Sequence, residues 1–303
     1  MRTGPTKTPG RQKASLPAGL DCATAFQEVA RGCIASISAH HSIACAGDAE
    51  AVHQIRVAIT RLRAAVSFFA PITVDAEWLR LKQEITWLNA ALGAARDCDV
   101  MTDYARRKPY RAWGQRMTGE HFDQRRIRGH RRLVRCLRSG RFRRLIEAMS
   151  GWVNRGPWLA RWERSARRKG AEPLEACCRR ELNRWRRWLI RKGRHLEILN
   201  ASQRHRLRIR AKRFRYILEA LTGIVAVRGR REFRHVLRPA KRLQRALGDL
   251  RDLKHFAVLG ATSPPDEDGN RGKERPPGYR RRREKLLGAA IEAHRDLKRA
   301  GAC

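Results

Sequence analysis

Residues 52–69, VHQIRVAITRLRAAVSFF, place one histidine and three arginines on a predicted helix, in a stretch that contains no acidic residue. At about 100° per residue, His53, Arg56, Thr60 and Arg63 fall within an arc of about 80° on one face. Like charges one helical turn apart destabilise a helix by a few tenths of a kcal/mol per pair. Arginine binds phosphate through a planar set of donors that can contact two oxygens at once. The stretch therefore indicates an anion site, and the alternative is a solvated charged face.

A second stretch, RHRLRIRAKRFRYILEAL at 204–221, repeats this pattern at an offset of 152 residues. The matched pairs are His53 with His205, Arg56 with Arg208, Arg61 with Arg213, and Arg63 with Arg215. In the second copy Lys212 lies on the same predicted face as His205, Arg208 and Arg215. Each ladder rises over roughly 15 Å of helix, which suits a linear string of phosphates better than a single phosphate.

A further pair of segments is WLNAALGAARDCDV at 87–100 and RLQRALGDLRDLKH at 242–255, with an offset of 155 residues. Two collinear matches at nearly one offset indicate an internal duplication of a helical unit. The glycines of the matched LG-x-x-RD elements are expected to end or bend a helix, and the aspartates to cap the next helix. The adjacent arginines are secondary ligand candidates: Arg96 and Arg251.

The charge balance of the whole chain also indicates an anionic partner. The 303 residues contain 68 Lys+Arg against 29 Asp+Glu, which gives a formal net charge of +39. Such a charge destabilises a compact chain unless a polyanion neutralises it, so nucleic acid, an anionic membrane and a phosphate polymer are the partner classes to compare. A hydrophobic content of 42% excludes a fully disordered chain.

Helical periodicity runs through almost all of the chain, and no alternating strand pattern is convincing. We expect an all-α fold with a disordered basic tail at 1–20, a first helical half at 21–165, a second at 172–300 and a mobile loop at 262–280. The joint between the halves is GPWLARWERSARRKG, and the tryptophans around it are expected to pack the halves together. Without a signal peptide, a long apolar run or a CxxC pair, the sequence predicts a reduced, cytoplasmic protein with no membrane span.

At these residues the chain resembles the CHAD family, the conserved histidine α-helical domain, over about residues 21 to 300. The resemblance rests on H-x-x-R-V-x-x-x-R-L-R from His53, L-G-x-x-R-D-x-D-V from Leu92, and H-x-x-R-I-x-x-K-R-x-R-Y from His205 to Tyr216. It implies two up-and-down four-helix bundles related by a pseudo-twofold axis, with a basic channel between them. It also implies binding of inorganic polyphosphate and association with polyphosphate granules, without catalysis by the domain itself. From the residues we expect no cofactor, and no metal at the histidines, because no carboxylate lies at ligand spacing.

The binding residues implied by the resemblance and the ladders share a positive or titratable side chain. They are His53, Arg56, Arg61, Arg63, His205, Arg208, Lys212, Arg213 and Arg215, with Arg96, Lys241 and Arg251 in addition. The first half departs from the usual pattern, because Thr60 and Thr86 stand opposite Lys212 and Lys241. We therefore expect the second half to hold an anion more tightly.

Two other functions stay open at this point. Sequence-independent nucleic-acid binding fits the net charge equally well, although few aromatic residues lie among the ladders. A metal-dependent polyphosphatase or phosphotransferase could use the histidines, but hydrolysis usually needs metal-binding carboxylates, which are scarce near these motifs. The oligomeric state cannot be predicted from the sequence.

Overall fold

The computed structural model describes residues 21–107, 110–111, 120–169, 173–224, 227–261 and 275–301, and within these ranges it contains helices and no strand. The predicted tail at 1–20 and most of the predicted loop at 262–280 lie outside the described residues. The helices are α1 (Cys22–Cys45), α2 (Ala49–Phe68), α3 (Ala70–Thr73), α4 (Ala76–Ala105), α6 (Glu120–Leu137), α7 (Gly140–Arg155), α8 (Pro157–Lys169), α9 (Leu174–Lys192), α10 (Ala201–Ile224), α11 (Val227–Ala261) and α12 (Tyr279–Arg299). The predicted all-α fold is confirmed.

Short polar residues fix where the long helices of the first half begin. Asp21, Asp48 and Asp75 each precede a helix and accept a hydrogen bond from the backbone N–H three residues later, at 2.7, 2.6 and 2.7 Å. Ser139 does the same for α7 at 3.2 Å. Side chains of this type satisfy amide groups that have no partner within the first helical turn. The cap at Asp48 thus fixes where α2, which carries the first cationic face, begins.

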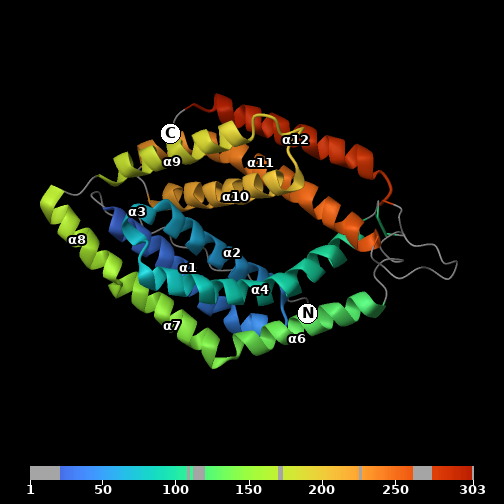
Figure 1. The fold of residues 1–303 in the computed structure, drawn as a ribbon, viewed down its shortest axis with the longest axis horizontal. Helices are drawn as coiled ribbons and strands as arrows, with labels where there is room; N and C mark the ends of the chain where they lie inside the picture. The colour runs from blue at the N-terminus through green and yellow to red at the C-terminus, as the bar shows by residue number, and fades with distance from the viewer. Residues whose placement is uncertain are drawn as a thin grey trace, which may run out of the picture.

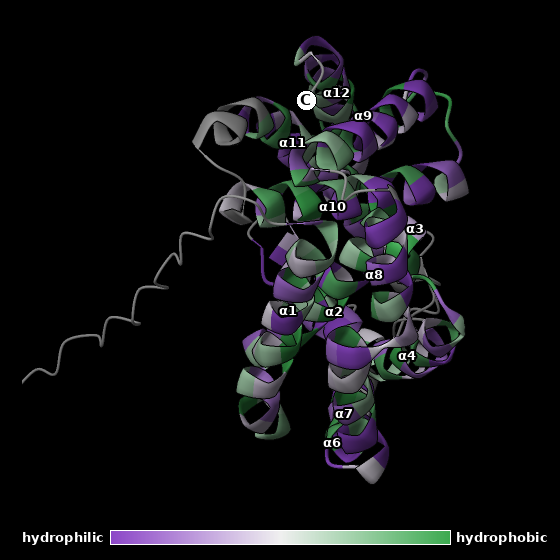
Figure 2. Cartoon of the chain, turned by 90° about the vertical axis from the view of Figure 1, so that its left-hand side faces the viewer, coloured by the Kyte–Doolittle hydropathy of each residue, from purple (hydrophilic) through white to green (hydrophobic). Residues whose placement is uncertain are grey.

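The helices form two sets, which Figure 1 shows one above the other. The first set contains α1, α2 and α4, with α6 and α7 packed on them, and the second contains α9, α10, α11 and α12. Figure 2 shows the same two sets from the side. The sets meet mainly where α2 packs against α10 and where α4 packs against α11. The two motif-bearing helix pairs therefore lie at the junction, while the duplication itself stays a prediction from the sequence.

One hydrophobic core runs through both sets, from Cys22 in α1 to Leu297 in α12. At the junction the rings of Phe68 and Trp185 meet edge to face, with centroids 5.6 Å apart. The predicted role of the tryptophans is thus correct for Trp185. Trp152 and Trp158 instead pack against Phe26 of the first set, at 5.7 and 5.1 Å. Because the core is shared, the two sets form one folded unit.

Two local expectations are wrong. The segment expected to be an irregular joint forms the helix α8, Pro157–Lys169, with a proline at its first position, where no amide donor is needed. Gly93 and Gly248 do not end a helix, because each lies inside one long helix, α4 or α11. Within the described parts of the chain, no helix has the length and apolar character needed to cross a bilayer.

Candidate functional site

The matched arginines Arg56 and Arg208 lie beside the matched glycines of the neighbouring helices. Arg56 Nη1 on α2 donates a hydrogen bond to the Leu92 carbonyl of α4 at 3.0 Å. A Cβ at Gly93 would lie 3.7 Å from Arg56 Nη1, and one at Gly248 would lie 3.8 Å from Arg208 Nε. A small residue at each position therefore leaves room for a guanidinium group of the adjacent helix, and alanine would fit there as well as glycine.

This explanation predicts the effect of small and large side chains at Gly93. Gly93→Ala is expected to raise the free energy of unfolding by about 0.5–1 kcal/mol, because alanine favours helix and its Cβ fits at an ordinary contact distance. Gly32→Ala on α1, where a Cβ meets nothing within 4 Å, is the matched control and should give the same gain in urea unfolding. Gly93→Leu should displace Arg56 and lose stability relative to Gly32→Leu. A destabilising Gly93→Ala would show instead that the backbone needs glycine.

Five cations from four helices converge at the junction: Arg56 of α2, Arg96 of α4, Arg208 and Lys212 of α10, and Arg251 of α11. We call them the cationic seam. Burial and then the positive charges of Arg208 and Arg56 lower the pKa of Lys212 to about 7. Burial likewise lowers the pKa of Arg56, and the charges of Arg96 and Arg251 lower it further. Residues predicted from both halves of the sequence thus share one electrostatic site.

Two carboxylates offset part of this charge. Asp97 on α4 favours the charged form of Arg56, and Asp252 on α11 favours that of Arg208. Burial raises the pKa of Asp252. Both aspartates were expected to cap a following helix; that expectation is wrong, since they lie within α4 and α11. The five cations outnumber these two acids, and Arg208 Nε is buried without a hydrogen-bond partner.

The two histidines differ in exposure. His53 is partly buried, and burial followed by the charge of Arg96 lowers its pKa, with a further contribution from Lys212 across the junction. His205 is mostly exposed, but its partial burial, followed by the charges of Arg251 and Arg208, lowers its pKa. An anion bound nearby would favour the charged form of both imidazoles.

Three other predicted ligands gather around an acid that the sequence reasoning missed. Glu219 on α10 lies 3.2 Å from Arg215, 3.2 Å from Lys241 of α11 and 3.8 Å from Arg61 of α2. We call these four residues the Glu219 cluster. The spacing of four residues from Arg215 to Glu219 is a helical ion-pair signal that could have revealed it. The Arg215 guanidinium group also packs on the Tyr216 ring, with its carbon 4.4 Å from the ring centroid.

The remaining predicted ligands, Arg63 of α2 and Arg213 of α10, lie near each other. Burial lowers the pKa of both arginines, and the charge of Arg63 adds to the effect on Arg213. The predicted site residues thus form three groups along α2 and α10: the cationic seam with its histidines, the Glu219 cluster, and the Arg63–Arg213 pair.

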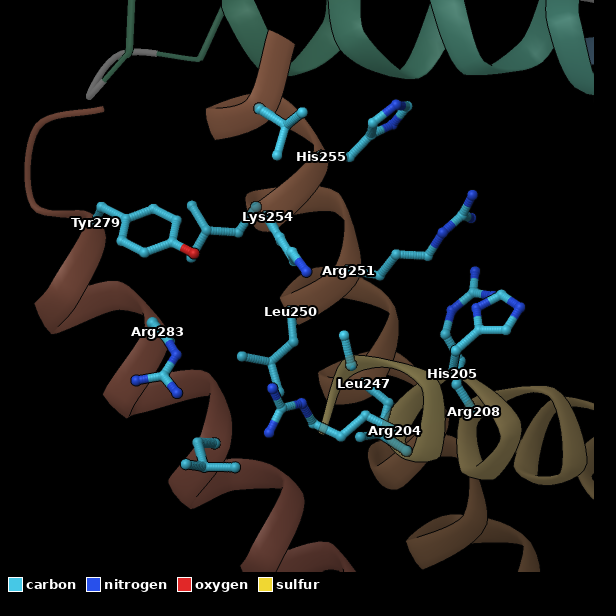
Figure 3. A pocket seen from close by; sticks show the side chains of 14 residues that line it. Arg204, His205, Arg208, Leu247, Leu250, Arg251, Lys254, His255, Tyr279 and Arg283 are labelled. Carbon is cyan, nitrogen blue, oxygen red and sulfur yellow. The ribbon is translucent and has the colours of Figure 1, made fainter. Parts of the chain in front are cut away.

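A cavity of about 320 Å³ opens beside the seam, lined entirely by residues of the second set. Figure 3 shows His205 and Arg208 of α10 on one side, Tyr279 and Arg283 of α12 on the other, and Leu250, Arg251 and Lys254 of α11 between them. In the first half Thr60 and Thr86 occupy the positions that match Lys212 and Lys241, and each donates a hydrogen bond to the carbonyl four residues earlier in its own helix. The cavity and both lysines therefore belong to the second set of helices.

Fold and site together define an all-helical protein whose two helix sets meet at a buried group of cations. The chain belongs to the CHAD domain family, whose model matches residues 28–260. Two solved structures share the fold. The CHAD domain from the plant Ricinus communis is 23% identical, with a TM-score of 0.67 and 97% of each chain covered. PptA from Streptomyces chartreusis is 13% identical, with a TM-score of 0.61, covering 93% of this chain and 99% of that one. No curated protein matches the sequence.

Proposed function

We propose that the protein binds inorganic polyphosphate at the cationic seam without catalysing its conversion. The observation that carries this proposal is the convergence of Arg56, Arg96, Arg208, Lys212 and Arg251 in a partly buried site where acids do not balance them. Phosphate oxygens would accept charge-assisted hydrogen bonds there, and burial together with the neighbouring arginines lowers the pKa of Lys212, as expected where cations are not offset by acids. Membership of the CHAD domain family supports the same ligand class.

The three groups of cations favour a polymer over a single phosphate. Each of the three groups combines a cation of α2 with one of α10. Burial lowers the pKa of Lys212 in the seam, and the charge of Arg215 in the Glu219 cluster lowers it further. A linear polyanion can occupy several of these groups at once, and the second contact then forms within the complex at a high effective concentration. We further propose that the protein is cytoplasmic and associates with polyphosphate granules through this binding.

A competition titration tests the proposed ligand. Long-chain polyphosphate and duplex DNA are titrated at equal total phosphate and at fixed ionic strength, because affinity for any polyanion falls steeply with salt. Polyphosphate is expected to bind more tightly and to resist displacement by DNA. If DNA displaces polyphosphate at equal phosphate concentration, the alternative of sequence-independent nucleic-acid binding is supported instead.

The proposal of binding without catalysis has its own measurement. Bound polyphosphate is expected to keep its chain length during incubation with magnesium or manganese, followed by gel electrophoresis. Release of phosphate that disappears in a His53→Ala/His205→Ala variant would instead support the metal-dependent hydrolase or phosphotransferase.

Glu219 should compete with the ligand, because it already occupies three of the cations as a phosphate would. Glu219→Gln is expected to tighten polyphosphate binding about threefold to tenfold, since partly exposed ion pairs of this kind are worth about 0.2–1 kcal/mol each. Glu84→Gln is the matched control: it breaks the bridge to Arg141 at 2.7 Å on α7, away from the junction, and should leave the affinity unchanged. Equal affinities of wild type and Glu219→Gln would show that the cluster lies outside the binding path.

A further inference from the structure

The cavity beside the seam has an apolar side that a phosphate polymer does not need. Leu250 of α11, Val258 near the end of α11, and Tyr279 and Leu287 of α12 all line it. Val258 is 47% exposed, so this side of the cavity presents apolar surface to water. Inorganic polyphosphate consists of charged oxygens and phosphorus and gains nothing from such a surface. The natural complement is an apolar group attached to a phosphate.

The opposite side of the same cavity is cationic and continuous with the seam. His205, Arg208 and Arg251 line the cavity and also belong to the site described above. Arg204 and Arg283 add two further charges, and their proximity shows in the pKa of Arg204, which burial lowers first and the charge of Arg283 lowers further. None of the 14 residues lining the cavity is acidic. Phosphates are therefore expected at this side.

The two sides together indicate a ligand with a phosphate tail and a planar apolar head. Figure 3 shows the Tyr279 ring across the cavity from His205 and Arg208, with Lys254 and Leu250 between. Arg275 is not among the residues that line the cavity and packs on the Tyr279 ring, with its guanidinium carbon 5.3 Å from the ring centroid. Tyrosine rings stack on nucleobases, each stacked base being worth about 1–3 kcal/mol. A volume of about 320 Å³ lies within the range of small-molecule sites.

We propose that this cavity binds a nucleoside polyphosphate, with the base against Tyr279, Leu250 and Val258 and the phosphates at His205, Arg208 and Arg251. This assignment rests on the proposed function for the phosphate affinity of the seam and adds an organic ligand to it. A nucleoside triphosphate and a polyphosphate would share Arg208 and Arg251, so each ligand displaces the other. The protein would thereby respond to the nucleotide level around it.

The test compares ATP with inorganic tripolyphosphate by calorimetric titration at fixed ionic strength and without magnesium. Both carry three phosphates, but tripolyphosphate carries more negative charge, so electrostatics alone predicts that tripolyphosphate binds more tightly. The cavity predicts the reverse, with ATP at least about tenfold tighter, as expected from stacking of one base. Equal affinities, or tighter binding of tripolyphosphate, overturn the proposal.

Variants localise the effect. Tyr279→Leu keeps an apolar side chain but removes the ring, and is expected to weaken ATP at least about fivefold with no change for tripolyphosphate. Val258→Ser serves as a second variant if the first does not fold. Ile43→Ser is the control, since Ile43 at the end of α1 is also half exposed, at 50%, and lies in the first set. A loss of ATP binding that is the same in Ile43→Ser, or absent from both cavity variants, overturns the assignment.

Long-chain polyphosphate measured in the same buffer separates this proposal from the proposed function. If polyphosphate binds and ATP shows no advantage over tripolyphosphate, only the nucleotide assignment fails. If ATP keeps its advantage and polyphosphate does not bind, only the proposed function fails. If none of the three ligands binds, both fail.

Discussion

Replacing Arg56 and Arg208 together by alanine is expected to weaken long-chain polyphosphate binding by about 100-fold or more. Hydrogen bonds to charged groups contribute about 1.5–3 kcal/mol each, and both arginines lie where the two helix sets meet. The effect should exceed that of either single change, because Arg56 approaches from α2 and Arg208 from α10. Fluorescence anisotropy with labelled polyphosphate of defined length measures the dissociation constants of the wild type and of the double variant.

The matched control removes the same amount of charge elsewhere. Arg280 and Arg281 are exposed on α12, and their double alanine variant keeps the seam intact. It should weaken binding only a few-fold, through the reduced overall field. Equal losses in the two double variants would mean that binding follows net charge and not a localised site.

Lys212→Met is expected to change stability and binding in opposite directions. The pKa of Lys212 is about 7 in the free protein against 10.5 ordinarily, because of burial and the charges of Arg208 and Arg215 on α10, Arg56 on α2 and Arg251 on α11. Since one pKa unit corresponds to about 1.4 kcal/mol, the charged lysine costs the free fold a few kcal/mol below pH 7. The variant should therefore unfold at a higher temperature and bind polyphosphate more weakly.

The pH dependence gives this prediction a definite sign. Between about pH 7 and 10.5 the unfolded chain holds more protons at Lys212 than the folded chain, so this residue makes stability rise with pH over that window. Bound phosphate raises the pKa of Lys212 and causes proton uptake, so affinity should fall as pH rises above 7. Thermal melts and titrations from pH 6 to 9 measure both slopes.

Two substitutions check that these slopes belong to Lys212. Lys212→Arg keeps a charge at every pH and should flatten the affinity profile above pH 7. Lys82→Met removes an exposed lysine from α4 and should leave both slopes as in the wild type. A wild-type profile that is flat between pH 7 and 9 would contradict a deprotonated Lys212 in the free site.

The sequence can indicate which residues share a helix face, because this depends on periodicity within single helices. Once the chain is helical, Arg56 and Arg208 must lie on defined faces, and the repeated pattern indicates which helices belong together. The LG-x-x-RD motif misleads because glycine in a sequence usually marks a helix end. In the fold Gly93 instead leaves room for Arg56 on a neighbouring helix, a reason that depends on tertiary packing.

Other parts of the site could not be predicted from spacing alone. The spacing of four residues between Arg215 and Glu219 indicates an ion pair within one helix. The contacts of Glu219 with Arg61 and Lys241, however, form only because α2 and α11 pack on α10. The cavity likewise needs α12, whose first residues belong to a segment expected to be a loop. Tyr279 therefore gave no functional signal in the sequence.

The hydrophobic core shared by the two helix sets has a consequence for how long a ligand must be. Because this core holds α2 against α10, the separation between the groups of cations is set before any polymer binds. A flexible chain of phosphates can adapt to this fixed separation, whereas a DNA duplex stays stiff over about 50 nm. Polyphosphates too short to reach a second group of cations should bind with sharply lower affinity. The rigid junction would thereby make the affinity depend on chain length.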